Sequence, residues 1–265
     1  MLKTLPGADR PPTLLESAFR HNRAPFIVLL VVLPLVCSSW IVVMARDMYG
    51  PMNGASAWMM TPAWDVRHVL LLWAMWAVMM AGMMLPSASP TLLLYGAAAR
   101  RRSGAGAARQ IYALATGYLV VWTLFSVLAT VVQRLLAVFL IVSPMMELTS
   151  PTAAATVLLV AGAYQLTPFK RACLQRCQSP LGFLMRHWRT GVTGAFRMGL
   201  EHGTYCLGCC WALMLLLFVG GVMNLAVIAA LTAFVAFEKL GPFGTQSARV
   251  SGALLMAVAV WMLVR

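Results

Sequence analysis

Three cysteines and a histidine stand close together in an apolar stretch of this sequence, at a spacing that could serve chemistry. The run EHGTYCLGCCW opens a long apolar segment and contains His202, Cys206, Cys209 and Cys210. At roughly 100° per residue, one face of a helix would carry all four side chains. Thiolate and imidazole groups are ligands of the kind that suit Cu(I) and Zn(II). The stretch therefore predicts a metal site or thiol redox chemistry within an apolar helix.

The rise of a helix limits how many of these residues one ion could bind. His202 and Cys210 are eight residues apart, so their Cα atoms would lie about 12 Å apart along the axis. A compact site would use Cys206 with Cys209 or Cys210, together with a ligand from another helix. His202 and Cys206 could form a second, shallower site. The alternative is that the cysteines merely fill space as small apolar side chains.

Two further groups of sulfur residues are candidate ligands. Cys173 and Cys177 are spaced i, i+4 in a basic stretch, where arginines favour the thiolate. They could receive or hand over an ion at the mouth of the helix, or simply pack at the membrane surface. Met75, Met79 and Met83 would share one helix face, and thioethers bind Cu(I) without losing a proton. Met79 and Met83 could therefore pass Cu(I) across a bilayer, although methionine is also an ordinary core residue.

The composition indicates the setting in which these residues must work. The chain is 61% hydrophobic and only 10% charged, against about a quarter charged in soluble domains. Its length suffices for six or seven membrane helices of about 20 residues each. We expect an all-α, polytopic transmembrane helical bundle of about seven helices, or six if the Gly220-Gly221 break is a kink. Residues 1–23 should form a cytoplasmic tail without a cleavable signal peptide, and residues 24–265 a single integral membrane domain.

Apolar segments and basic loops predict how the chain is threaded. The expected helices are at 24–45, 66–85, 110–142, 152–167, 195–219, 222–237 and 248–264. Lysines and arginines gather in the segments that alternate helices would place on one side, which predicts that this side and the N-terminus are cytoplasmic. The net charge of +13 is explained by these loops, which contact anionic lipid headgroups of the bilayer. A nucleic-acid partner is therefore not expected.

Several short motifs are shared with one bacterial family. They are YQLTPFK from Tyr164, CLQRC from Cys173, GTYCLGCCW from Gly203, GVMNL from Gly221, and Glu238-Lys239. Over roughly Trp73 to Gly244, the chain resembles the bacterial predicted metal-binding integral membrane proteins, domain of unknown function 2182. The resemblance implies a metal-binding protein of the bacterial inner membrane, and copper handling is the role usually suggested for this family.

Three functions remain open from the sequence. The first is Cu(I) handling, either transport or delivery to a cuproenzyme, with zinc possible because the same ligands serve both ions. The second is a membrane thiol-disulfide oxidoreductase that cycles Cys206 and Cys209. The third is a structural subunit of a larger membrane complex. The sequence lacks the haem-attachment, phosphate-loop and zinc-protease motifs, so an enzyme is not favoured. Glu238 and Lys239 are expected to form an ion pair at the membrane interface.

Overall fold

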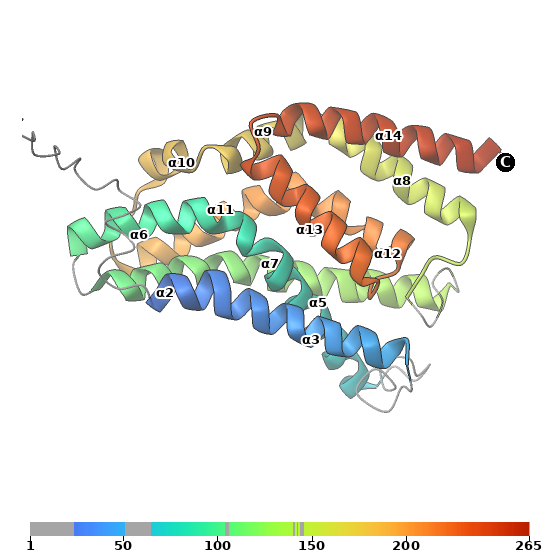
Figure 1. Ribbon diagram of the computed structural model, residues 1–265, viewed down its shortest axis with the longest axis horizontal. Helices are drawn as coiled ribbons and strands as arrows, with labels where there is room; N and C mark the ends of the chain where they lie inside the picture. The colour runs from blue at the N-terminus through green and yellow to red at the C-terminus, as the bar shows by residue number, and fades with distance from the viewer. Residues whose placement is uncertain are drawn as a thin grey trace, which may run out of the picture.

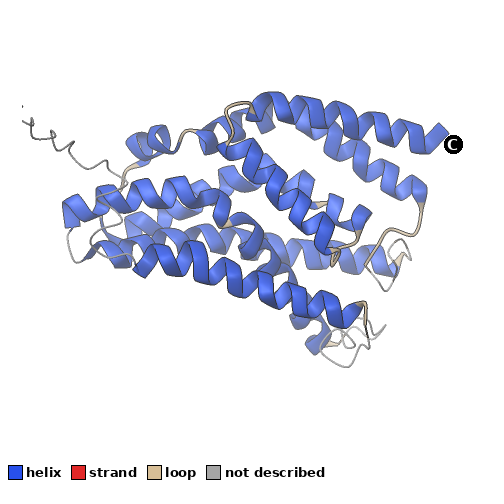
Figure 2. Cartoon of the chain, in the orientation of Figure 1, coloured by secondary structure: helices blue, strands red, loops and turns tan. Residues whose placement is uncertain are grey.

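The computed structural model describes residues 24–50, 65–103, 106–139, 141, 143 and 146–264. Within these ranges the regular secondary structure is helical and contains no strand (Figure 2). The expected all-α fold is therefore confirmed. The predicted tail at residues 1–23 lies outside the described residues.

The helices follow the expected order but differ from the predicted boundaries. A first rod consists of α2 (Ala24–Ile27), the π-helical η1 (Val28–Val32) and α3 (Leu33–Met48). The later helices are α5 (Val66–Met84), the 3-10 turn η2 (Pro86–Ala88), α6 (Ser89–Ser103), α7 (Ala107–Val138), α8 (Pro151–Leu166), α9 (Pro168–Gln178), α10 (Pro180–His187), α11 (Gly191–Met214), α12 (Leu216–Gly220), α13 (Leu225–Leu240) and α14 (Gly244–Val264). Figure 1 shows them packed as a bundle of long, roughly aligned rods, with α10 at one end.

Two predicted loops are in fact helical. The chain does not leave the helix at Pro86, because a proline is tolerated in the first turn of a helix, where its missing N–H costs nothing. The basic stretch after Pro168 forms α9 and α10. Thr167 ends α8 in an extended conformation and its hydroxyl accepts a hydrogen bond from the Lys170 N–H. The result is a bend of 65° between α8 and α9, which turns α9 across the bundle.

The described helices fit a membrane protein. Five of them are long and apolar enough to cross a bilayer, and the bent pair α8–α9 would make a sixth. The helix α13 has 16 residues and is shorter than a usual span of about 20 residues. Many large apolar side chains point outward from these helices, among them Leu35, Leu128 and Leu254. Such surfaces suit contact with lipid.

The Gly220-Gly221 break is a turn rather than a kink. Gly221 has a φ of +90°, in the left-handed region that favours glycine. Asn224 then caps α13 by accepting hydrogen bonds from two backbone N–H groups. After this turn α13 runs back along the bundle, and α14 reverses again (Figure 1). The described residues therefore contain seven successive helical passages, of which five, or six with the bent pair α8–α9, are long and apolar enough to span a bilayer.

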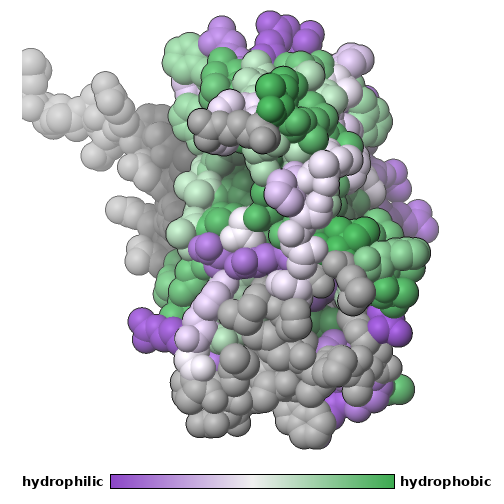
Figure 3. Space-filling model, turned by 90° about the vertical axis from the view of Figure 1, so that its right-hand side faces the viewer, coloured by the Kyte–Doolittle hydropathy of each residue, from purple (hydrophilic) through white to green (hydrophobic). Residues whose placement is uncertain are grey.

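Charge differs between the two ends of the bundle. The end of α6, the start of α7 and helix α10 lie at one end of the bundle, and α9 follows α10 inward to the α13–α14 corner (Figure 1). The α6–α7 connection and the α9–α10 region carry most of the described arginines. The connections at the opposite end carry Asp47, Asp65 and Glu147. Figure 3 looks onto this second end, where hydrophilic residues stand among hydrophobic ones. We call the end that carries the arginines of α6, α7, α9 and α10 the basic end.

Glycines let the central helices approach closely. A Cβ atom on Gly199 of α11 would collide with the carbonyl oxygen of Leu114 on α7, and one on Gly117 would collide with the Phe196 carbonyl. Small residues at such contacts are the usual way in which membrane helices pack tightly. The close approach of α7 and α11 places Tyr118 beside Cys206, whose surroundings are described next.

Candidate metal centre

Five sulfur side chains from three helices come together in the core. Two contacts between sulfur atoms join four of these side chains. Cys209 Sγ lies 4.0 Å from Cys177 Sγ, and Cys210 Sγ lies 3.9 Å from Met84 Sδ. Cys206 is on the same helix as Cys209 and Cys210. We call Met84, Cys177, Cys206, Cys209 and Cys210 the sulfur cluster. Cys177 is half-buried and the other members are buried.

The spacing of these sulfurs suits a shared ion in pairs rather than in a larger set. With metal–thiolate bonds of about 2.3 Å, two sulfurs on one ion lie roughly 3.8–4.6 Å apart. The Cys177–Cys209 distance of 4.0 Å is within that range. Among the described residues, no group of three or more His, Cys, Asp or Glu side chains is arranged to hold a metal ion. Structural zinc sites generally use four ligands, whereas the contacts between sulfur atoms in this site join them in pairs.

The thiols of Cys209 and Cys210 both donate a hydrogen bond to the same acceptor. Each donates to the carbonyl oxygen of Cys206, at 3.1 and 2.8 Å respectively. A thiol must lose its proton to become a metal ligand. Binding of an ion to either residue would therefore break a hydrogen bond within α11.

A buried lysine faces the sulfur cluster, which sequence reasoning missed. Lys239 Nζ on α13 donates to Cys206 Sγ at 2.8 Å and to Ser87 Oγ at 3.0 Å, and it lies 3.9 Å from Met84 Sδ. No carboxylate lies within ion-pair distance of it among the described residues. A buried ammonium is costly unless a charge or several polar groups compensate it. The neighbour that can supply a negative charge is the Cys206 thiolate.

The expected pair between Glu238 and Lys239 is wrong. Glu238 Oε2 instead accepts from Lys170 Nζ at 2.7 Å, and both side chains are almost fully buried. Neighbouring residues on a helix point about 100° apart. Glu238 therefore faces α9 while Lys239 faces the sulfur cluster. A lysine in an apolar helix was the available signal, because ionisable residues at such depth are functional by default.

Tyr118 contributes a hydroxyl to the same site. Its Oη lies 3.0 Å from Cys206 Sγ and donates to the Met84 carbonyl oxygen at 2.9 Å. A phenol has a single proton, so the hydroxyl either donates to the Met84 carbonyl and accepts from the Cys206 thiol, or donates to Cys206 once that thiol has lost its proton. Cys206 is thus held between Tyr118 and Lys239, and its surroundings differ from those of its two neighbours on α11.

The other predicted ligands, His202 and Cys173, pack against different neighbours. The buried His202 ring packs between Tyr118 and Phe183, with ring centroids 5.7 and 5.2 Å away, and its Nδ1 has no hydrogen-bond partner among the described residues. No hydrogen bond joins it to Cys206 in the described part of the chain, and the second, shallower site that the two residues could form stays a prediction. Cys173 packs against Gly208, where a Cβ would lie 2.8 Å from its Sγ.

The methionine that reaches the cysteines is not one of those predicted. Met79 and Met83 are buried in the core of α5. Met84, at the end of that helix, is the one whose sulfur contacts Cys210. Met79 and Met83 lie on the same helix as this contact. Their role as a path for Cu(I) stays a prediction. The period of the helix identified the methionine-rich segment, but only tertiary packing could identify the contacting residue.

Comparison with known proteins supports a copper-related assignment. The family described as PpoB2, copper chaperone, matches residues 73–262, which is well over half of the chain. The matched range includes every member of the sulfur cluster together with Lys239 and Tyr118. No curated protein and no solved structure matches the chain. The prediction of a copper-related family is confirmed in this broader form, under a different name from the one that the motifs suggested. The chain belongs to the copper chaperone family.

Proposed function

We propose that this protein is an integral membrane copper chaperone, which holds Cu(I) in the sulfur cluster and delivers it to a cuproenzyme or another membrane partner. The observation that carries the proposal is the meeting of sulfur atoms from α5, α9 and α11 at distances of 3.9 and 4.0 Å. Soft thiolate and thioether ligands select Cu(I). Copper is the cargo here, so ligands on separate helices suit a site that must also release it.

Lys239 supports this role through its charge. A Cu(I) ion bound by two thiolates carries a net negative charge, which is expensive to bury unless a cation lies nearby. Lys239 Nζ is already 2.8 Å from Cys206 Sγ. We infer that the ammonium is the counter-charge of the loaded site and that Cys206 is one of the thiolates. Cys209 is the second candidate, with Cys177 completing the path to the surface.

The direction of the protein in the membrane follows from its charges. We propose that the basic end faces the cytoplasm of a bacterial cell, as positive-inside asymmetry requires. The N-terminus would then be cytoplasmic and the C-terminus outside. Cys177, on α9 near the basic end, would be the sulfur nearest the cytoplasm. A cysteine introduced at Gly106 or at the C-terminus would test this orientation, because a thiol reagent that cannot cross the membrane reacts only with the side to which it is added.

The metal content of the purified protein tests the function directly. The protein would be purified in mild detergent under reducing conditions and measured by elemental mass spectrometry. We expect near-stoichiometric copper, lost in the variant Cys206→Ser/Cys209→Ser/Cys210→Ser. Cys37→Ser is a matched control, since Cys37 is a buried free cysteine that packs against Gly82. Zinc in place of copper would correct the metal, and no metal even after Cu(I) loading would overturn the proposal.

Thiol-disulfide exchange is the second candidate function, and one contact favours it. The sulfur atoms of Cys177 and Cys209 lie 4.0 Å apart, which makes them a candidate pair besides Cys206 and Cys209, the pair proposed from the sequence. A disulfide would require the sulfurs to approach to about 2.05 Å. Trapping of free thiols before and after mild oxidation would reveal such a bond. A reversible Cys177–Cys209 disulfide in a protein that binds no copper would support this candidate over copper delivery.

A further inference from the structure

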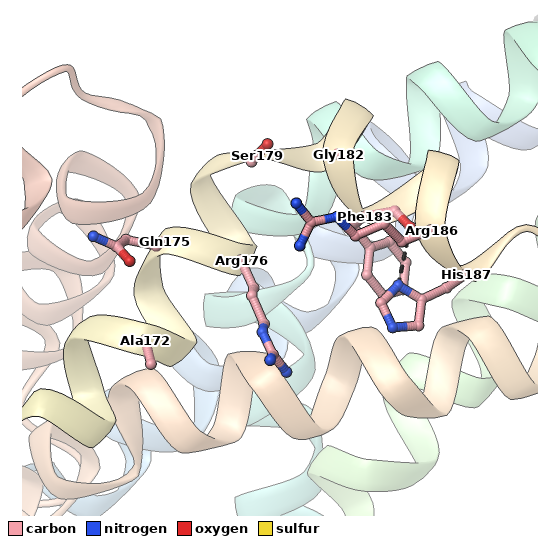
Figure 4. Close-up of a pocket in the computed structure, with 8 residues that line it drawn as sticks. All are labelled: Ala172, Gln175, Arg176, Ser179, Gly182, Phe183, Arg186 and His187. Carbon is pink, nitrogen blue, oxygen red and sulfur yellow. Dashed lines mark hydrogen bonds between the residues drawn. The ribbon is translucent and has the colours of Figure 1, made fainter.

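A polar cleft opens between α9 and α10 at the basic end. Its volume is about 590 Å³, within the roughly 300–1,000 Å³ of small-molecule sites. Phe183, which is almost fully buried, forms part of its wall. The lining residues are Ala172, Gln175, Arg176, Ser179, Gly182, Phe183, Arg186 and His187. Figure 4 shows Arg176 and Arg186 entering this space from the two helices, with His187 beside them.

The charge of the cleft is not balanced by the described part of the chain. Two acidic residues are described near the basic end, and both are already paired. Glu238 binds Lys170, and Glu201 binds Arg189. The Arg176 guanidinium instead lies over the Tyr205 ring, 4.5 Å from its centroid. Guanidinium groups bind carboxylate and phosphate well because their donors form a planar fork. A ligand for this cleft should therefore be a small anion.

The same helix that lines the cleft carries the entry to the sulfur cluster. Arg176 precedes Cys177 in α9. Cys177 is the one half-buried member of the sulfur cluster, and its Sγ lies 4.0 Å from Cys209 Sγ. Cys177 does not itself line the cleft, but it directly follows Arg176 in α9, so an anion bound to Arg176 would be held one residue away from the least buried thiol of the cluster. This position suggests that the ligand also takes part in the chemistry of the Cys177 thiol.

We propose that the cleft between α9 and α10 binds a small anionic thiol that carries Cu(I), and that Cys177 is the first acceptor of the ion. The inference rests on the proposed function, which it extends by naming the donor. Arg176 and Arg186 would bind the carboxylates of the donor. A bond then forms between Cys177 Sγ and Cu(I), and the bond between the donor sulfur and Cu(I) breaks. The proton of Cys177 goes to the departing thiolate, and copper remains Cu(I), so no oxidant or reductant is needed.

Paired donors test this proposal. Cu(I) would be presented as its complex with mercaptosuccinate, which has two carboxylates, or with 2-mercaptoethanol, which has none. The initial rate of copper uptake would be followed in detergent by elemental mass spectrometry of the separated protein. We expect Arg176→Gln/Arg186→Gln to slow uptake from mercaptosuccinate about tenfold, the factor that corresponds to one lost charge-assisted hydrogen bond. Uptake from 2-mercaptoethanol should not change.

Further variants separate the roles of individual residues. Arg197→Gln is the matched control, because Arg197 is an exposed arginine of α11 that does not line the cleft. It should leave both rates unchanged. Arg186→Gln alone should slow the mercaptosuccinate reaction while keeping the Arg176–Tyr205 contact. Cys177→Ser should slow uptake from both donors, since it removes the acceptor rather than the docking site.

Three outcomes would contradict the inference. If the double variant slows both donors equally, the arginines do not recognise the anion. If Cys177→Ser leaves both rates unchanged, Cys177 is not the acceptor. If phosphatidylglycerol added at about one lipid per protein blocks the mercaptosuccinate reaction and the double variant abolishes lipid binding, the cleft is a headgroup site. Failure of the parent protein to take copper from either donor would instead overturn the proposed function itself.

Discussion

Two lysines are buried in the described part of this protein, and their neighbours are opposite in kind. Lys170 on α9 faces the Glu238 carboxylate, which also accepts a hydrogen bond from Gln165. Lys239 on α13 faces a thiol, a hydroxyl and a thioether. The first lysine has its full counter-charge in place. The second obtains one only when Cys206 is ionised. The difference separates a structural ion pair from a charge that is available for chemistry.

The structural pair also positions the chemical one. Glu238 and Lys239 are successive residues of α13, so fixing one fixes the other. The backbone carbonyl of Glu238 accepts a hydrogen bond from Gln178 Nε2 at 2.7 Å, which adds a second tie between α13 and α9. The Lys239 ammonium is thereby held against the sulfur cluster. Under the proposed function, this rigid frame would surround ligands that themselves have to change partners.

The largest expected effect comes from breaking the structural pair. Glu238→Gln leaves Lys170 buried without its counter-charge, and removing one partner of a buried ion pair costs about 3–5 kcal/mol. Thermal unfolding in detergent should show a correspondingly large loss of stability. The double variant Lys170→Met/Glu238→Gln should recover much of it, because the unpaired charge is then gone. Unfolding of the single variant at the parental temperature would mean that Lys170 is compensated in another way.

Replacement of the second lysine should affect copper more than stability. Lys239→Met removes the charge but keeps an unbranched side chain in the site. Retention of Cu(I) against a competing chelator should fall about 10- to 100-fold, as expected for a lost hydrogen bond to a charged group. Ser87→Ala is the control, since it removes the other hydrogen-bonded neighbour of Lys239 and keeps the ammonium. Unchanged retention in Lys239→Met would show that the loaded site is balanced by some other cation.

Tyr118→Phe should have a smaller effect at the same thiol. It removes the hydroxyl that contacts Cys206 and the Met84 carbonyl but keeps the ring against His202. We expect a loss of about 0.5–1.5 kcal/mol of stability and a severalfold weaker hold on Cu(I). Tyr205→Phe serves as the comparison, because Tyr205 is on α11 with its ring under Arg176. Equal effects of the two substitutions on copper would argue against a specific role for the Tyr118 hydroxyl.

The smallest effect is expected at the partly exposed ion pair. Arg189→Gln breaks the contact with Glu201. The side chain of Arg189 is 43% exposed and that of Glu201 is 29% exposed. Exposed pairs contribute about 0–1 kcal/mol, so the unfolding temperature should hardly move and copper retention should not change. Measured beside Glu238→Gln, this variant calibrates how much burial adds to the cost of breaking an ion pair. A large loss of stability here would remove that distinction.

The sequence allowed the helices to be predicted because long apolar runs leave few other structures possible in a membrane. It also placed Cys206, Cys209 and Cys210 on one helix face from period alone. It could not show that α9 folds over α11 to bring Cys177 to Cys209, since that depends on the bend at Pro168. It also misassigned Lys239, because adjacent opposite charges suggested a local pair while helix geometry directs the two side chains apart. Which side chains pair between helices depends on how the helices pack, and this packing cannot be read from the order of residues.

The fixed ammonium of Lys239 has a consequence for which ions the sulfur cluster will accept. A monovalent ion with two thiolates carries one net negative charge, which the ammonium neutralises. A divalent ion with the same two thiolates is already neutral, so the ammonium would leave an uncompensated positive charge in the core, which is costly. Under the proposed function, Lys239 would therefore favour a monovalent over a divalent ion, and Zn(II) should be rejected even though the sulfur ligands would suit it.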